Sequence, residues 1–178
     1  MHKIGLFYGS TDGNTAVAAE RIQEEFQRRD LATVDLFDVA EAYLDEMQLY
    51  DYLILGIPTW DTGQLQRDWE EAFDEFDSLD LSGKTVALFG LGDQHGYANT
   101  FADALFFVAD KVQAQGARLV GRWPTVGYTF AQSWAADGEH FLGLVLDEVN
   151  QPQLSELRIQ VWVQQLAVAF ALISSEVK

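Results

Sequence analysis

The chain has 178 residues, of which 48% are hydrophobic and 22% are charged, and this composition is ordinary for a globular protein with a sizeable core. Eleven Lys and Arg residues stand against 28 Asp and Glu residues, which gives a formal net charge of −17 and argues against nucleic acids and anionic membranes as partners. The sequence contains no cysteine, so disulfides, thiolate metal sites and cysteine nucleophiles are all excluded.

No basic region followed by an apolar stretch opens the sequence, and the apolar run at residues 166–173 is too short to span a bilayer. We therefore expect a cytoplasmic protein, with a single domain over residues 1–178. The acidity has two readings at this point. It either confers solubility alone or complements the surface of a basic protein partner.

In chain order, the first part is expected to form a strand at residues 3–8, a helix at 15–27, a strand at 32–37, a short helix or turn at 39–47, a strand at 52–56 and a loop at 58–63. The helix prediction rests on helical spacing, which points Val17, Ala18, Ile22 and Phe26 inward. The run at 52–56 is continuously apolar, as in strands covered on both faces.

The second part is expected to form a helix at residues 66–76, a strand at 85–89, a helix at 99–115, a strand at 117–121 that breaks off from 122 to 140 and resumes at 141–146, and a helix at 156–173. The first of these helices would turn Trp69, Phe73 and Phe76 inward. Gly116 is a natural helix stop, and Ser155 is a plausible N-cap for the last helix.

Strands that alternate with helices at this spacing predict an α/β fold with a parallel sheet and helices on both faces. In such sheets, ligands bind beyond the carboxyl ends of the strands, at the point where the strand order reverses. The loops after the first, third and fourth strands are therefore the candidate ligand site.

The first of these loops, at residues 10–15, is rich in hydroxyl groups and runs into a helix. Its backbone N–H groups and the positive end of the helix dipole favour a phosphate. It lacks both the Gly-Lys-Ser/Thr ending of a nucleotide triphosphate loop and the spacing of a dinucleotide fingerprint, so a monophosphate is favoured. The alternative is a helix N-terminus with nothing bound.

The other two loops each offer an aromatic side chain. Trp60 lies in the loop at 58–63, and Tyr97 follows the three glycines of the loop at 90–97. An indole suits stacking on a planar ligand, although it could also fold back as a lid on the core. One phosphate cradle and two aromatic planes on one sheet edge predict a flat ring system with a single phosphate, which fits FMN.

Four segments match those of a known family, and the match extends over nearly the whole chain. They are residues 4–10 (IGLFYGS), 56–63 (GIPTWDTG), 83–94 (GKTVALFGLGDQ) with Gly96 and Tyr97, and 141–148 (FLGLVLDE) with Asn150 and Gln151. With these motifs, the chain resembles the long-chain flavodoxins, and most closely a second, enterobacterial-type subgroup. The break at 122–140 resembles the insertion that this family carries in its last strand.

The resemblance implies a flavodoxin-like three-layer α/β/α sandwich with a five-stranded parallel sheet in the order 2-1-3-4-5. Residues 10–15 would hold the phosphate, Trp60 and Tyr97 would stack on the two ring faces, and residues 91–93 would approach the pyrimidine edge. The full set expected to contact FMN is Ser10, Thr11, Asp12, Gly13, Asn14, Thr15, Pro58, Thr59, Trp60, Asp61, Thr62, Gly63, Gly90, Leu91, Gly92, Asp93, Tyr97 and Phe101.

The implied function is that of a low-potential, one-electron carrier with noncovalent FMN that shuttles between semiquinone and hydroquinone, with no catalytic residue and no metal. Carboxylates at the ring edge would oppose the negative charge of the reduced ring. The implied partners are basic faces of redox proteins, namely a donor of the NADPH-dependent flavodoxin reductase type and low-potential acceptor enzymes. We expect a monomer.

Three positions depart from the family pattern. Asp12 stands where threonine is usual, so we expect its carboxylate to turn away from the phosphate, toward solvent. His95 replaces an aliphatic residue and is interpreted as a surface histidine, and a ligand contact at Val149 is in doubt.

Two alternative functions remain open from the sequence. One is an FMN-dependent NAD(P)H:quinone-type oxidoreductase of the same fold, which would oxidise NADPH steadily on its own. The other is a receiver-like signalling domain, which would purify colourless and would need a phosphorylatable Asp in an acidic pocket.

Overall fold

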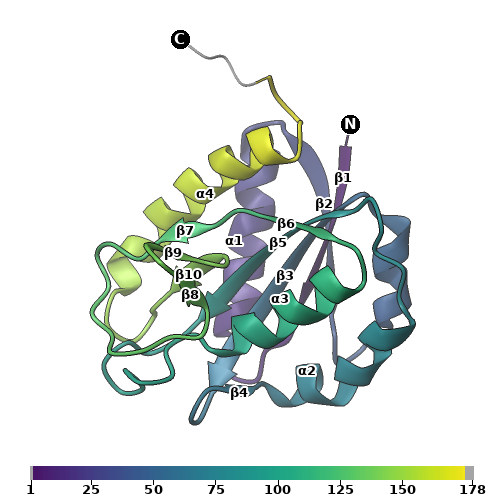
Figure 1. Cartoon of the computed structure of the whole chain (residues 1–178). Coiled ribbons are helices and arrows are strands. Elements are labelled where there is room, and N and C mark those ends of the chain that lie inside the picture. Colours follow the sequence, from purple (N-terminus) through teal and green to yellow (C-terminus); the bar gives the residue numbers. More distant parts are fainter. Residues whose placement is uncertain (1, 175–178) are drawn as a thin grey trace.

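The computed structural model describes residues 2–174 and contains a central parallel sheet with helices on both faces (Figure 1). Its main strands are β1 (His2–Tyr8), β2 (Ala32–Asp38), β3 (Tyr52–Trp60), β5 (Thr85–Leu91) and β10 (Leu144–Leu146). They lie in the order β2-β1-β3-β5-β10, with β6 (Arg118–Val120) also paired to β5. This arrangement confirms the predicted fold class and the strand order 2-1-3-4-5.

The fifth strand of the sheet is divided between β6 and β10. The first piece pairs with residues 85–87 of β5, and the second pairs with residues 89–91. Between them the chain leaves the sheet and forms β7 (Trp123–Pro124), β8 (Ala136–Asp137) and β9 (His140–Phe141), an antiparallel group in the order β7-β9-β8. The predicted interruption is therefore present.

Glycine at position 143 lets the chain return to the sheet. A Cβ built there would lie 2.1 Å from the carbonyl oxygen of Leu88, which no side chain tolerates. The predicted continuous strand at 141–146 is wrong, because Phe141 pairs within the insertion and the sheet resumes only at Leu144.

Helices α1 (Asn14–Arg28) and α4 (Ser155–Ala169) pack side by side on one face, and α3 (Ala104–Ala114) covers β3 and β5 on the other, beside α2 (Arg67–Ala72) (Figure 1). Short 3₁₀ helices lie at η1 (Leu44–Leu49), η2 (Phe73–Ser78) and η3 (Pro152–Leu154), and β4 (Gln64–Leu65) folds back on the end of β3. Within residues 2–174, no helix is both long enough and apolar enough to cross a membrane.

The continuous apolar strands are explained by two separate cores. Along β3, Leu53 and Leu55 contact the cluster under α2 and α3, whereas Ile54 contacts the cluster under α1 and α4. Trp162, which is fully buried, belongs to the second cluster. A strand covered on both faces has no polar side to present, so alternation is lost.

Several helix boundaries in the structure differ from the predicted ones. The helix expected at 66–76 is divided between α2 and η2, the one expected at 99–115 begins only at Ala104, and the short helix expected at 39–47 lies at 44–49. Val17, expected inward, is 44% exposed. The Ser155 N-cap is wrong, because α4 continues directly from η3 and Ser155 is already helical, with a buried hydroxyl that has no hydrogen-bond partner.

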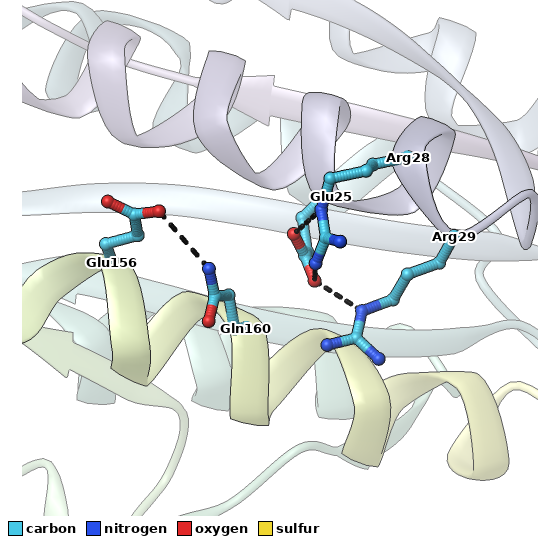
Figure 2. Close-up of polar contacts among 5 residues, drawn as sticks. All are labelled: Glu25, Arg28, Arg29, Glu156 and Gln160. Atoms are coloured by element: carbon cyan, nitrogen blue, oxygen red, sulfur yellow. Dashed lines mark hydrogen bonds and ion pairs between the residues drawn. The ribbon is translucent and has the colours of Figure 1, made fainter.

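A carboxylate near the end of α1 binds two arginines, the last residue of this helix and the residue that follows it (Figure 2). Glu25 is 6% exposed and accepts two hydrogen bonds from Arg28, at 2.9 and 2.8 Å, and one from Arg29. Burial alone would raise the pKa of Glu25, but the hydrogen bonds from Arg29 and Arg28 outweigh it and hold the pKa below 4.5. On the facing helix α4, Glu156 accepts from Gln160 at 3.2 Å.

We expect Glu25→Gln to lower the free energy of unfolding by about 1–2 kcal/mol at pH 7. This value is reduced for solvent screening, because Arg28 is largely exposed. Since the folded-state pKa is depressed, this stabilisation is complete above the unfolded pKa and is lost as the pH falls through the folded pKa. Urea unfolding of both proteins between pH 7 and pH 3 measures it. A difference that stays constant across this range would contradict the assignment.

Candidate functional site

The carboxyl ends of β1, β3, β5 and β10 meet at a cavity of about 290 Å³. Because neighbouring strands are parallel and in register, the loops that follow them open on the same edge of the sheet. The residues that line the cavity are Ser10, Thr11, Asp12, Asn14, Thr15, Pro58, Thr59, Trp60, Asp61, Leu91, Gly92, Asp93, Tyr97, Glu148 and Val149.

The loop between β1 and α1 places hydroxyl-bearing residues at the cavity. Ser10 Oγ accepts hydrogen bonds from the backbone N–H groups of Gly13 (3.1 Å) and Ala16 (3.4 Å), so its own proton is left to donate. Gly13 has a φ of 89°, which turns the chain sharply into the helix. The first N–H groups of α1 have no acceptor within the helix, and the first turn carries no carboxylate.

A hydrogen bond from Gln66 likewise leaves the Thr11 hydroxyl proton available to donate. The Gln66 side-chain amide donates to Thr11 Oγ1 at 3.2 Å, and its Oε1 accepts from Trp69 N–H at 3.4 Å, which caps α2. Gln66 is only 1% exposed, so the amide that joins two segments 55 residues apart is itself buried, whereas Thr11 is exposed. The Thr11 hydroxyl, already an acceptor for Gln66, can donate into the cavity.

A hairpin at the end of β3 presents Trp60 to the cavity. Trp60 pairs with Gln64 of β4, and Asp61 and Gly63 in the turn have φ values of 44° and 86°. A positive φ is strained for aspartate and free for glycine, so the turn from 61 to 63 is tightly specified. Thr59 anchors the hairpin, because its Oγ1 accepts the N–H of Ala104 at 3.1 Å.

The loop after β5 is shaped by Asp93. Its Oδ1 accepts the N–H groups of Gly96 (2.7 Å) and His95 (3.1 Å). The hydrogen bond from Gly96 is the main cause that lowers the pKa of Asp93 below its usual value. A Cβ at position 96 would lie 2.3 Å from the Asp93 carboxylate, so a side chain there would displace this carboxylate. This turn carries Tyr97, which is 46% exposed at the cavity.

Asp147 ties the loop after β5 to the loop after β10. It is fully buried, and its Oδ2 accepts both the backbone N–H (3.1 Å) and the side-chain amide (2.7 Å) of Gln94. Its Oδ1 accepts the N–H groups of Val149 (3.1 Å) and Asn150 (2.9 Å). Gln94 in turn accepts the N–H of Thr129 at 2.6 Å, so the insertion is joined to the same network.

The structure gathers thirteen of the eighteen residues expected at the site into the cavity lining, and five lie outside it. Gly13 lies in the turn behind the hydroxyls, and Gly90 is enclosed within β5. Thr62 and Gly63 line a neighbouring cleft. Phe101 is fully buried and packs on Phe141 in the core.

Four functional residues were missing from the expected contact set. Glu148 and Val149 line the cavity, and Gln66 and Asp147 hold its loops. Glu148 lies within a segment that matched the family motif and could have been included on that signal, whereas Val149 departs from the family pattern and carried no such signal. Gln66 carries no such signal, because its partner Thr11 is far away in the sequence.

The charges around the cavity are negative or absent. Among its lining residues there is no Lys, Arg or His, and the carboxylates are Asp12, Asp61, Asp93 and Glu148. His95 is exposed, as expected for a surface histidine. Asp12 is exposed but also lines the cavity, so the orientation of its carboxylate away from the phosphate stays a prediction. Within residues 2–174, no cluster of His, Asp or Glu could hold a metal ion. The site can therefore bind an anion only through neutral donors, beside two aromatic side chains.

Comparisons with known proteins agree with this geometry. The family model described as "Flavodoxin" matches residues 6–162. A flavodoxin of Picosynechococcus is 49% identical over 97% of this chain and 100% of its own length, and Flavodoxin 1 of Escherichia coli is 44% identical over 92% of each.

Among solved structures, a Fusobacterium nucleatum flavodoxin bound to flavin mononucleotide is 29% identical, with a TM-score of 0.87 over 93% of this chain and 97% of that chain. The resemblance to the flavodoxins is thus confirmed. The finer resemblance to a second, enterobacterial-type subgroup stays a prediction.

We expect Asp147→Asn to lower the free energy of unfolding by about 2–3 kcal/mol, because one of the acceptor atoms becomes a donor that faces other donors. For a chain of this size, that loss corresponds to a melting temperature lower by roughly 4–12 °C, which calorimetry measures. The matched control is Glu148→Gln at the half-buried rim, expected to change stability by no more than about 0.5 kcal/mol. Equal effects of the two variants would exclude a special role for Asp147.

Proposed function

The chain belongs to the flavodoxin family, and we propose that it binds FMN without a covalent bond and carries single electrons on it. It is an electron-transfer protein and does not convert a substrate of its own. The observation that carries the proposal is a single cavity in which the hydroxyls of Ser10 and Thr11 are set to donate beside the aromatic side chains of Trp60 and Tyr97.

The cavity residues fit the chemistry of FMN. We assign the phosphate to residues 10–15, where the two hydroxyls and the first amides of α1 are free to donate. Trp60 and Tyr97 would border the two faces of the ring, and residues 91–93 its polar edge. When bound, FMN supplies a ring that accepts and releases electrons one at a time.

The protein's own residues would tune this chemistry without moving a proton through a side chain. The aromatic side chains exclude water from the ring faces, and the carboxylates of Asp61, Asp93 and Glu148 disfavour added negative charge. One like charge ~10 Å away costs roughly 1.7 kcal/mol at an effective dielectric constant of ~20. These effects support a low potential for the bound cofactor.

We further propose a monomer whose acidic face receives basic redox partners, namely an NADPH-dependent flavodoxin reductase as donor and low-potential acceptor enzymes. The net charge of −17 supports such partners, since complementary charge speeds encounter. A cavity built from the loops of one chain supports the monomer. The proposal includes a cytoplasmic location, where NADPH-linked donors operate, and a single flavodoxin-like domain over residues 1–178.

The proposed function is tested by adding FMN to the purified protein and reducing it stepwise with dithionite. We expect one FMN per chain, quenched flavin fluorescence and a blue intermediate in the visible spectrum. A folded protein that takes up no FMN would contradict the proposal. Steady NADPH oxidation without a partner protein would instead favour the quinone-reductase alternative.

We expect Gln66→Glu to weaken FMN binding by more than about tenfold, or ~1.4 kcal/mol. A carboxylate at this position accepts the Thr11 proton and removes a donor from the phosphate cradle. Riboflavin lacks the phosphate, so its affinity should change by less than about threefold. Fluorescence titrations with the two flavins measure both values.

Gln66→Met is the companion variant, because it removes the side-chain amide that donates to Thr11 without adding a charge. It should weaken FMN binding less than Gln66→Glu does, while riboflavin binding again changes little. If either variant weakened FMN and riboflavin equally, Gln66 would have a general structural role and no specific part in the phosphate site.

A further inference from the structure

We propose that a second cleft, beside the cavity, receives a cationic side chain (Arg or Lys) from the basic face of a redox partner. This inference rests on the proposed function, because it specifies how an electron-transfer partner docks. The cleft has a volume of about 730 Å³. It is lined by Thr62, Gly63, Gln64, Leu65, Glu70, Asn99, Thr100, Asp103, Phe107, Gln132 and Trp134.

An exposed tryptophan on a firmly held backbone forms one wall of the cleft. The Trp134 residue is 60% exposed, although its backbone N–H donates to the buried Asp103 carboxylate at 2.7 Å. The residue before it is also fixed, since Ser133 Oγ donates to the carbonyl of Phe101 at 2.5 Å. The insertion therefore holds a large indole out in solvent at a defined place, which is costly unless another surface covers it.

Two phenylalanines of α3 extend this aromatic surface. The rings of Phe106 and Phe107 both lie 5.8 Å from that of Trp134, and Phe106 is 40% exposed. Aromatic faces attract a guanidinium or ammonium group, and tryptophan does so most strongly. Such rigid aromatic side chains also dominate the binding energy of protein interfaces.

The charges around the cleft select a cation. Asp103 and Glu70 line it, and Asp110 lies exposed on α3, four residues after Phe106 and so on the same side of the helix. None of the lining residues is Lys, Arg or His. Lys111 on the same helix points elsewhere, over the ring of Phe73 and toward Asp77. A cation would pair with the exposed carboxylates of Glu70 and Asp110, which an apolar side chain cannot do, whereas Asp103 already accepts the backbone N–H of Trp134.

The position of the cleft connects it to electron transfer. The hairpin turn after β3 separates the two hollows: Trp60 and Asp61 line the cavity, whereas Thr62 and Gly63 line the cleft. A partner anchored at Trp134 would therefore contact the loop that borders the proposed ring site. Binding at Trp134 would fix the distance that an electron crosses between the proposed ring site and the partner.

The test uses the FMN-loaded protein as the substrate of a purified NADPH-dependent flavodoxin reductase from Escherichia coli, whose Flavodoxin 1 is 44% identical to this chain. We expect Trp134→Ala to raise the KM for the carrier at least about fivefold, with little change in kcat. The double variant Glu70→Gln/Asp110→Asn should raise KM by a similar factor and weaken its dependence on salt. FMN affinity should stay within about twofold of wild type for all variants.

The matched control is Tyr43→Ala. Tyr43 is a 73% exposed aromatic residue in the segment after β2, the strand at the opposite edge of the sheet, and its removal should leave KM unchanged. Values for Trp134→Ala equal to those for Tyr43→Ala would overturn the proposal. An increase for Trp134→Ala without one for the charge variant would indicate an apolar occupant and would also overturn it.

This experiment distinguishes a failure of the proposed carrier function from a failure of the docking proposal. A wild-type protein that takes up no FMN would remove the proposed function, and the docking proposal with it. A wild-type protein that binds FMN and is reduced, with the same KM for every variant, would leave the carrier function intact and remove only the cleft.

Discussion

In-register parallel pairing of β1, β3 and β5 is the constraint on which the site depends. Each strand ends at the same edge, so the hydroxyl loop, the Trp60 hairpin and the Asp93 turn open on one cavity. Buried polar side chains then fix these loops against one another. Gln66 joins the first to the start of α2, and Asp147 joins the third to the end of β10.

The acidity of the chain is compatible with the proposed phosphate site, because that site contains no cationic side chain. Hydroxyls that already accept a hydrogen bond, and amides at the start of a helix, donate without changing the net charge. The negative surface is then available for two other purposes. Under the proposed function, it opposes the addition of charge to the cofactor and attracts basic partners.

The strand order and most of the cavity lining were predicted from the family resemblance, which rests on motifs that are local in the chain, and a break in the strand pattern indicated the interruption of the fifth strand. Contacts between distant segments were missed. Nothing near Gln66 reveals its bond to Thr11, and nothing near Ser155 reveals that η3 continues into α4 and removes its capping role. Gly143 shows the same limit, since its need for glycine comes from the Leu88 carbonyl on another strand.

The most direct test of the neutral phosphate cradle is a crystal structure of the protein with FMN. We expect the phosphate oxygens to lie within hydrogen-bond distance of the Ser10 and Thr11 hydroxyls and of the first amides of α1, with the ring between Trp60 and Tyr97. A phosphate held by Lys or Arg side chains, or a ring bound outside this pair of aromatic residues, would contradict the central claim.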